Sequence, residues 1–182
     1  GKTRIDHVLS EAARLQAIKH NEAVSLNRQY LRRLIQSVVF LSKQELAFCS
    51  NRKNESAANK GNYLELLDLL AQNESMVRDH LQSSSLLKGT SPDIQNDLIE
   101  VVTDALNERI KCEVKESPFL SIQADETLDV SCKTQMSIIF RYCVSDRIEE
   151  RFVGLYDVSK NKTAAGLSEV IRQALNDWDI DV

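Results

Sequence analysis

The sequence predicts an α+β fold, with a helical domain at residues 1–117 and a β-β-β-α domain at residues 118–182. Through Ser117, apolar residues recur at the three- and four-residue spacing of amphipathic helices. After Pro118 they alternate instead, as they do in strands with one buried face. This change of period sets the boundary between the two predicted domains.

Residues 1–50 are predicted to be helical, and "YLRRLIQSVVFLSKQELAF" (30–48) gives the helix one apolar face. The basic residues of this segment fall largely off that face, and the polar side is mixed in charge. We therefore expect the helix to pack into a core rather than on a membrane. The predicted stripe comprises Leu31, Leu34, Ile35, Val38, Leu41 and, as one polar exception, Glu45.

Three further helices are expected before Pro118. The polar stretch "CSNRKNESAANKGN" (49–62) predicts a loop in which Gly61 suits a turn. Two short helices follow in "YLELLDLLAQ" and "ESMVRDHLQ", and "SSSLLKGT" connects them to a third. Ser91 suits the cap of that third helix and Pro92 its first position. Its predicted stripe is Ile94, Leu98, Val101, Val102, Leu106 and Ile110.

The segments after Pro118 predict a three-stranded antiparallel sheet with one covering helix. The strands are expected in "FLSIQAD" (119–125), "TQMSIIFRYCV" (134–144) and "RFVGLYDV" (151–158), and the short "VSDRI" predicts a hairpin between the last two. In the second strand the buried face is expected to carry Met136, Ile138, Phe140 and Tyr142. The final helix, in "TAAGLSEVIRQALNDW", is expected to bury Leu167, Val170, Ile171, Ala174, Leu175 and Trp178.

Charge is unevenly distributed along the chain, whose net charge is −4. Residues 1–60 contain 11 basic and 5 acidic residues, whereas residues 61–182 contain 12 and 22. A basic first part indicates either contact with nucleic acid or a solvated helix surface rich in Arg and Lys. Because aromatic residues do not alternate with the basic ones, we expect at most weak, non-specific DNA binding through the N-terminal helices.

The four cysteines, Cys49, Cys112, Cys132 and Cys143, are widely spaced, form no CxxC pair and lie far in sequence from the histidines. This pattern favours buried free thiols over a zinc site. The sequence contains no apolar run of membrane-spanning length and no apolar signal core at its start. We therefore expect an intracellular protein, nuclear or cytoplasmic, without membrane contact.

The stretch "FLSIQADETLDVS" (119–131) ends an apolar run on Asp125. Such a residue either begins an ordinary polar turn or delivers a carboxylate to a metal ion. Mg²⁺ requires several oxygen ligands, and the local sequence offers one well-placed candidate. Glu126 points to the opposite face if the strand continues, and Asp129 lies beyond the strand. Thr127 and Ser131 suit a cap or a turn.

Six stretches resemble hAT-superfamily transposases, in particular transposase-derived proteins of the zinc-finger MYM-type-like and repressor-of-the-inhibitor-of-protein-kinase-like kinds. They occur in the order found in that family and span roughly residues 30–182. The stretches are "VVFLSKQELAF", "NKGNYLELLDLL", "SPDIQNDLIEVV", "QADETLDVS", "QMSIIFRYC" and "IEERFVGLYDV".

This resemblance implies a ribonuclease H-like core preceded by a helical domain, so that residues 118–182 would be the opening β-β-β-α portion of that core. In the family, the first catalytic Asp lies on the first strand, and Asp125 matches it. Asp125 is therefore the candidate catalytic residue and metal ligand, expected to be inactive alone. We expect it at the C-terminal end of its strand, facing away from Leu120 and Ile122.

The chain also departs from the family pattern. The family's other acidic residues lie on elements after the first core helix, which is where this sequence ends. A BED or THAP-type zinc finger is missing, and "FCSNRK" stands where relatives often carry an Arg-Gly turn. We expect a truncated, domesticated protein with an interaction or regulatory role and no cofactor, Mg²⁺ belonging only to a complete parent enzyme. The alternatives are a fragment of a DDE-type hAT transposase, which needs C-terminal segments for metal-dependent strand transfer, and a purely structural domain.

The predicted sheet also bears on association. In a ribonuclease H-like sheet the first strand is flanked by a later parallel strand, which would follow Val182. Without it, "FLSIQAD" has an unpaired edge of backbone donors and acceptors, and such edges pair with other chains unless they are covered. We therefore expect self-association or a protein partner.

Overall fold

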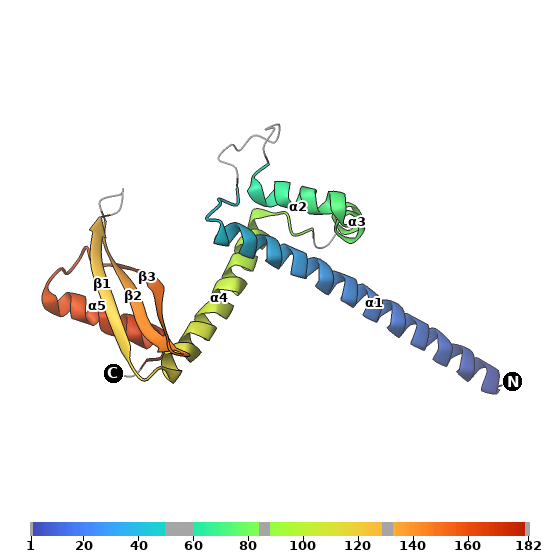
Figure 1. The fold of residues 1–182 in the computed structure, drawn as a ribbon. Helices are drawn as coiled ribbons and strands as arrows, with labels where there is room; N and C mark the ends of the chain where they lie inside the picture. Colours follow the sequence, from blue (N-terminus) through green and yellow to red (C-terminus); the bar gives the residue numbers. More distant parts are fainter. Residues whose placement is uncertain (1, 50–59, 84–87, 129–132, 181–182) are drawn as a thin grey trace. The chain divides into compact units, whose positions relative to one another are not determined.

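The structure, a computed structural model of the 182-residue chain, describes residues 2–49, 60–83, 88–128 and 133–180. The chain forms two compact units, a helical unit (residues 1–103) and a sheet unit (residues 104–182). The division falls within α4 (Pro92–Glu116), which contributes to both units (Figure 1). Residue 117, where the sequence analysis divides the chain, is where helix gives way to strand.

The helical unit contains α1 (Lys2–Lys43), α2 (Asn62–Asn73), α3 (Ser75–Ser83) and the first turns of α4. The helices expected from the sequence are thus confirmed, although α1 ends before residue 50. Gly61 precedes α2 with a φ of 101°, a conformation that favours glycine, as its predicted turn requires. The core of the unit is made by α1, α2, α3 and α4 and comprises Tyr30, Leu34, Val38, Leu41, Tyr63, Leu67, Val77 and Leu98.

The buried stripe of α1 matches the predicted one except at two positions. The predicted residues found in the core are Leu34, Ile35, Val38 and Leu41. Leu31 is 37% exposed, and Glu45 lies beyond the helix with a φ of 55°, so their predicted places on the stripe were wrong. Tyr30 is fully buried in place of Leu31. Its ring stacks on His80 with centroids 3.8 Å apart, and its hydroxyl donates to the carbonyl oxygen of Lys88 at 2.6 Å. Contacts with α3 and with residue 88, far away in sequence, therefore decide which face of α1 is buried.

The start of α4 follows the sequence prediction, and so does most of its stripe. The residues that pack into the two cores as predicted are Ile94, Leu98, Val102 and Ile110. The backbone N–H of Ile94 donates to the Ser91 hydroxyl at 3.3 Å, which satisfies one free donor of the first turn. Val101 and Leu106 are exposed, contrary to the predicted stripe. The helix buries Leu98 in the core of the helical unit and Val114 in that of the sheet unit. Because the two cores are separate, the buried face is not continuous along the helix.

The sheet unit contains β1 (Leu120–Leu128), β2 (Thr134–Val144), β3 (Arg147–Asp157) and α5 (Ala164–Asp177), in the spatial order β1-β2-β3. Both strand pairs are antiparallel, and α5 lies across one face (Figure 1). The predicted three-stranded sheet with one covering helix is confirmed. The predicted hairpin is also present, since Ser145 and Asp146 have φ values of 48° and 64°, as in tight hairpin turns.

One face of the sheet, the inner face, forms the core of this unit. It packs against α5 and the last turns of α4, as the alternation of β2 predicts. The ring of Trp178 meets that of Phe140 edge to face, with centroids 5.7 Å apart. The buried cluster comprises Val114, Met136, Ile138, Phe140, Tyr142, Val158, Ala174, Leu175 and Trp178.

A β-bulge in β3 changes which side chains face the core. Ile138 pairs with Gly154 and Ile139 with Phe152, so Val153 is an extra residue between them. Val153 packs against the buried cluster. The alternation therefore shifts by one residue after the bulge, and Leu155 lies on the opposite face of the sheet, which we call the outer face.

Two buried tyrosines of the helical unit provide a matched test of its packing. Tyr30 donates a hydrogen bond to Lys88, whereas the Tyr63 hydroxyl has no hydrogen-bond partner among the described residues. We expect Tyr30→Phe to lower the free energy of unfolding by about 1 kcal/mol, since it removes a formed bond. Tyr63→Phe should be neutral or stabilising, since it removes an unpaired polar group. Urea unfolding followed by the helical circular dichroism signal measures both.

Candidate functional site

Asp125 lies on β1, but not at its end. The strand continues to Leu128, because Thr127 pairs with Gln135 and Leu128 with Thr134 of β2. The expectation that Asp125 ends the strand was therefore wrong. Its side chain is exposed on the outer face, whereas Leu120 and Ile122 pack against the inner cluster, as expected.

The pairing of β1 with β2 gives Asp125 a hydroxyl neighbour. Asp125 is directly opposite Ser137, and the Ser137 hydroxyl donates to the Asp125 backbone oxygen at 3.2 Å. Glu126, next in sequence, pairs with Met136, whose side chain is buried in the inner cluster, so Glu126 does not share the face of Asp125. Asp129 and Ser131 lie outside the described residues.

The nearest described acids of the outer face are on β3. Asp157 and Glu150 belong to that strand, which is separated from β1 by β2. Two strand spacings amount to about 9.6 Å, well beyond the reach of carboxylates that share one metal ion. Both are also engaged, since Asp157 accepts from the Ser159 backbone N–H at 2.9 Å and Glu150 pairs with Arg141 at 3.6 Å.

The described residues around Asp125 do not by themselves make up a Mg²⁺ site. Mg²⁺ requires near-octahedral oxygen coordination, and two-metal catalysis holds its ions about 3.5–4 Å apart through several carboxylates. Within the described residues, no second acid of β1 or β2 shares the face of Asp125, and no group of three His, Cys, Asp or Glu side chains is arranged to hold a metal ion.

The rest of the outer face is partly apolar and uncovered by described residues of the sheet unit. Ile148, Phe152 and Leu155 of β3 are 61%, 60% and 53% exposed. Ile139 of β2 pairs with Phe152 and joins them to the polar side chains of β1. An exposed apolar patch on a sheet is typical of a surface that contacts another protein.

Two hollows in the described chain do not resemble catalytic sites. In the helical unit, a mainly apolar groove of 230 Å³ lies between α1 and α2, and the Arg33–Glu74 ion pair (2.8 Å) borders it. In the sheet unit, a polar hollow of 420 Å³ contains acids of α4 and α5. Lys111 lines it and pairs with Asp179 at 3.2 Å and Glu108 at 3.6 Å. This lysine offsets the negative charge that would attract a cation.

The cysteines do not follow the sequence prediction. Cys49 and Cys112 are exposed and Cys143 is half-buried, so the expectation of buried thiols was wrong for the first two. Cys49 lies after α1, and Cys112 is on a face of α4 that the core does not cover. Cys132 and most of the "FCSNRK" loop lie outside the described residues. None of the helices in the described ranges is both long and apolar enough to cross a membrane.

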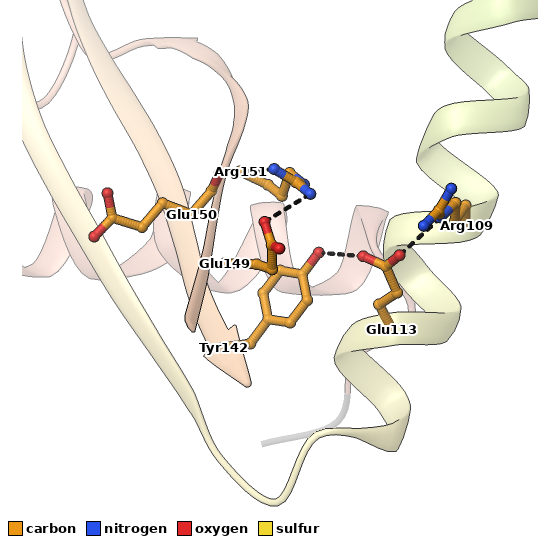
Figure 2. A network of polar contacts seen from close by, with 6 residues as sticks. All are labelled: Arg109, Glu113, Tyr142, Glu149, Glu150 and Arg151. Atoms are coloured by element: carbon orange, nitrogen blue, oxygen red, sulfur yellow. Dashed lines mark hydrogen bonds and ion pairs between the residues drawn. The ribbon is translucent and has the colours of Figure 1, made fainter. Parts of the chain in front are cut away.

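A polar network joins α4 to the end of the sheet (Figure 2). The Tyr142 hydroxyl donates to one carboxylate oxygen of Glu113 at 2.8 Å, and the Arg109 guanidinium donates to the other at 2.8 Å. Arg151 pairs with Glu149 at 2.8 Å on the same side of the sheet. Apart from Tyr142, whose burial the alternation of β2 predicts, these residues were not singled out in the sequence. A buried tyrosine at a strand end requires an acceptor, but its identity depends on how α4 packs.

The contact between Tyr142 and Glu113 shifts the pKa values of both groups. Hydrogen bonds from Arg109, and then from Tyr142, lower the pKa of Glu113 below its usual value. Burial, and then the hydrogen bond to Glu113, raises the pKa of Tyr142 to about 12. At neutral pH the carboxylate is therefore ionised and the phenol protonated. Because neither group titrates near pH 7, the pair is not suited to general acid–base catalysis. Its hydrogen bond links α4 to the sheet.

Comparison with known proteins gives the family. A family model described as "DUF4371: ZMYM1/FAM200, RNase-like domain" matches residues 5–182. The chain belongs to this family. Membership confirms the resemblance to hAT-related, transposase-derived proteins that the six sequence stretches indicate.

A similarity to one curated protein also supports the assignment to transposase-derived proteins. The human "52 kDa repressor of the inhibitor of the protein kinase" is 22% identical over 134 residues, which is 70% of this chain. The aligned part is 18% of the relative's length, so this DUF4371 chain corresponds to a minor part of that protein. No solved structure matches the chain.

The Tyr142–Glu113 contact leads to a stability prediction. Glu113→Ala should lower the free energy of unfolding of the sheet unit by about 1–3 kcal/mol, because it leaves a buried hydroxyl without its acceptor. The loss should be smaller when Tyr142→Phe is already present, since the hydroxyl is then gone. Urea unfolding followed by Trp178 fluorescence measures all four proteins of the cycle. Equal losses in both backgrounds would contradict the assigned contact.

The same contact has a defined pH dependence. The pKa of Glu113 is lower in the folded chain than in the unfolded chain, so its ionised form stabilises the fold. This contribution is complete above the ordinary Glu pKa of about 4.3 and is lost as pH falls through the folded pKa. The stability difference between the wild-type chain and Glu113→Gln should therefore shrink between about pH 5 and pH 3. A pH-independent difference would contradict the assignment.

Proposed function

We propose that this chain acts as a transposase-derived interaction or regulatory module without catalytic activity of its own. The position of Asp125 is the observation that carries the proposal. It is exposed on the outer face of the sheet, and β2 separates it from the described acids of that face. The apolar residues of β3 on the same face are suited to contact with a protein.

The proposal includes a more specific fold. In it, the β-β-β-α segment is the opening portion of a ribonuclease H-like fold, and Asp125 occupies the position of the first catalytic acid. The family description as an RNase-like domain supports this, as does the place of Asp125 on the first strand. Asp125 then descends from a metal ligand, while the chain lacks the neighbouring carboxylates in its described part.

A second candidate function follows from the same strand. The chain could be part of a DDE-type hAT transposase, in which carboxylates from other segments join Asp125 to hold Mg²⁺ for strand transfer. The placement of Asp125 on the first strand of an RNase-like domain favours this alternative. The two candidates differ in whether Asp125 binds a metal ion.

The proposal also includes weak contact with nucleic acid. Arg14, Arg28, Arg32 and Lys43 are exposed, and their spacing places them on one side of α1. A row of cations on a helix can neutralise phosphates without reading base sequence. A nuclear or cytoplasmic location belongs to this proposal, since nucleic acid is available there.

The first test concerns Asp125. We expect no saturable Mg²⁺ or Mn²⁺ binding by the 182-residue chain in calorimetric titration, and no metal-dependent cleavage of plasmid DNA. Asp125→Asn should behave like the wild-type chain in both assays. Ser121→Ala, on the same face of β1, is a matched control for changes in the strand.

Two results would favour the second candidate function, a part of a DDE-type transposase. Saturable Mn²⁺ binding that Asp125→Asn removes and Ser121→Ala retains would overturn the proposed lack of catalytic function. Metal-dependent DNA cleavage with the same dependence on Asp125 would support a working part of a transposase.

The second test concerns DNA. Binding to duplex DNA should be weak, independent of sequence and steeply reduced by salt, because it depends on the release of counterions. Arg28→Glu/Arg32→Glu should weaken it and lower the slope of log K against log salt by up to about 1.8, or about 0.9 for each phosphate that the protein no longer neutralises. Fluorescence anisotropy at several salt concentrations measures this slope.

The matched control reverses two exposed arginines of the sheet unit, Arg147→Glu/Arg172→Glu, which changes the net charge equally. An equal loss of affinity in both double variants would show that net charge, and not the row on α1, governs binding. Strong sequence preference or insensitivity to salt would also contradict the prediction.

A further inference from the structure

Between residues 13 and 29, α1 carries a partly apolar stripe that no described element of the helical unit covers. In Figure 1, α1 extends well past α2 and α3. From residue 13 to residue 29, every side chain is exposed except that of Val24, which is intermediate. Leu15 and Leu26 are 59% and 51% exposed. Their side of the helix continues toward Tyr30 and Leu34, which are buried in the core.

The stripe has the spacing of a coiled-coil seam. Residues 15, 19, 22 and 26 are separated by four, three and four positions, as the core positions of a heptad are. Two of them are apolar, Leu15 and Leu26, and the two between them are charged, Lys19 and Glu22. Neither charged residue forms an ion pair within the described chain.

This order of residues is complementary to itself when the helix direction is reversed. The midpoint between Leu15 and Leu26 lies between residues 20 and 21, and so does the midpoint between Lys19 and Glu22. In an antiparallel pair centred there, each Leu15 meets Leu26 of the second copy. Each Lys19 likewise meets Glu22 of the second copy, so every charge at the seam has an opposite partner.

The same sequence disfavours a parallel pair. In that arrangement each Lys19 would face the second copy's Lys19, and each Glu22 its Glu22. Like charges at the core of a coiled coil oppose association, which makes orientation a consequence of the charge order. The basic row formed by Arg14, Arg28, Arg32 and Lys43 lies on a different side of α1 and does not enter the seam.

We infer that the occupant of this face is a second copy of the chain, joined through an antiparallel coiled coil of α1 centred between residues 20 and 21. The inference deepens the proposed function, on which it rests, by naming a partner and a surface for the interaction role. The seam spans about 17 Å of helix from Leu15 to Leu26, at about 1.5 Å per residue. The exposed stripe continues beyond it toward the core of the helical unit.

The test reverses one charge at a time in the 182-residue chain. In analytical ultracentrifugation the wild-type chain should form a species of twice its 20.6 kDa mass as concentration rises. Lys19→Glu and Glu22→Lys should each raise the dissociation constant about tenfold or more, because each places like charges at the seam. The double variant Lys19→Glu/Glu22→Lys should restore the dimer, since its charges again match in the antiparallel register.

Three comparisons make the result specific. Arg28→Glu reverses a charge on the same helix off the seam and should leave the dimer intact. An equimolar mixture of the two single variants should form a heterodimer. Circular dichroism should show unchanged helix content, because Lys19 and Glu22 are exposed and contact no core.

Several outcomes would overturn the inference. A strictly monomeric wild-type chain would exclude a second copy as the occupant of the stripe. A dimer that is insensitive to charge reversal at Lys19 and Glu22 would place the interface elsewhere, for example on the edge of β1. These variants leave Asp125 and the outer face of the sheet unchanged, so metal titration of the same proteins reports separately on the proposed function.

Discussion

β2 is the central strand of the described sheet, with β1 on one side and β3 on the other, and the sheet unit depends on its alternation. Its inward side chains, from Met136 to Tyr142, are at most 2% exposed. Burying each large side chain contributes about 1.5–3 kcal/mol, and a slip of one residue would move the whole set to the outer face. The inner face of β2 therefore fixes the register of both neighbours and the surface on which α5 packs.

The burial of only one face of the sheet also determines the surroundings of Asp125. The register that turns Ile122 toward the core turns Asp125 outward, opposite Ser137. The same register places the described acids of that face on β3, two strand spacings away. Among the described residues, the fold thus presents a carboxylate on an open sheet face without bringing a second one to it. Leu155 joins that face because the bulge at Val153 shifts the alternation of β3.

The helical unit shows a related division between covered and uncovered apolar surface. From Tyr30 to Leu41, α1 is packed by α2, α3 and the start of α4, whereas its stripe from Leu15 to Leu26 is exposed. Lys19 and Glu22 interrupt that exposed stripe, which limits non-specific association while allowing one charge-matched orientation. The outer face of the sheet and the stripe of α1 both expose apolar side chains, and the proposed contacts with proteins rest on these two surfaces.

The sequence by itself determined the order and type of the elements, the cap of α4, the hairpin after β2 and the buried faces of β2 and α5. In β2 and α5 the apolar residues keep one spacing along the whole segment, and that spacing indicates which side of the element is apolar. Tertiary structure decided that β1 extends past Asp125, because strand length depends on the partner's hydrogen bonds and not on local polarity. It also decided that Tyr30 rather than Leu31 is buried and that Glu113 receives the Tyr142 hydrogen bond. Each of these depends on contacts between residues far apart in the chain, which local periodicity does not encode.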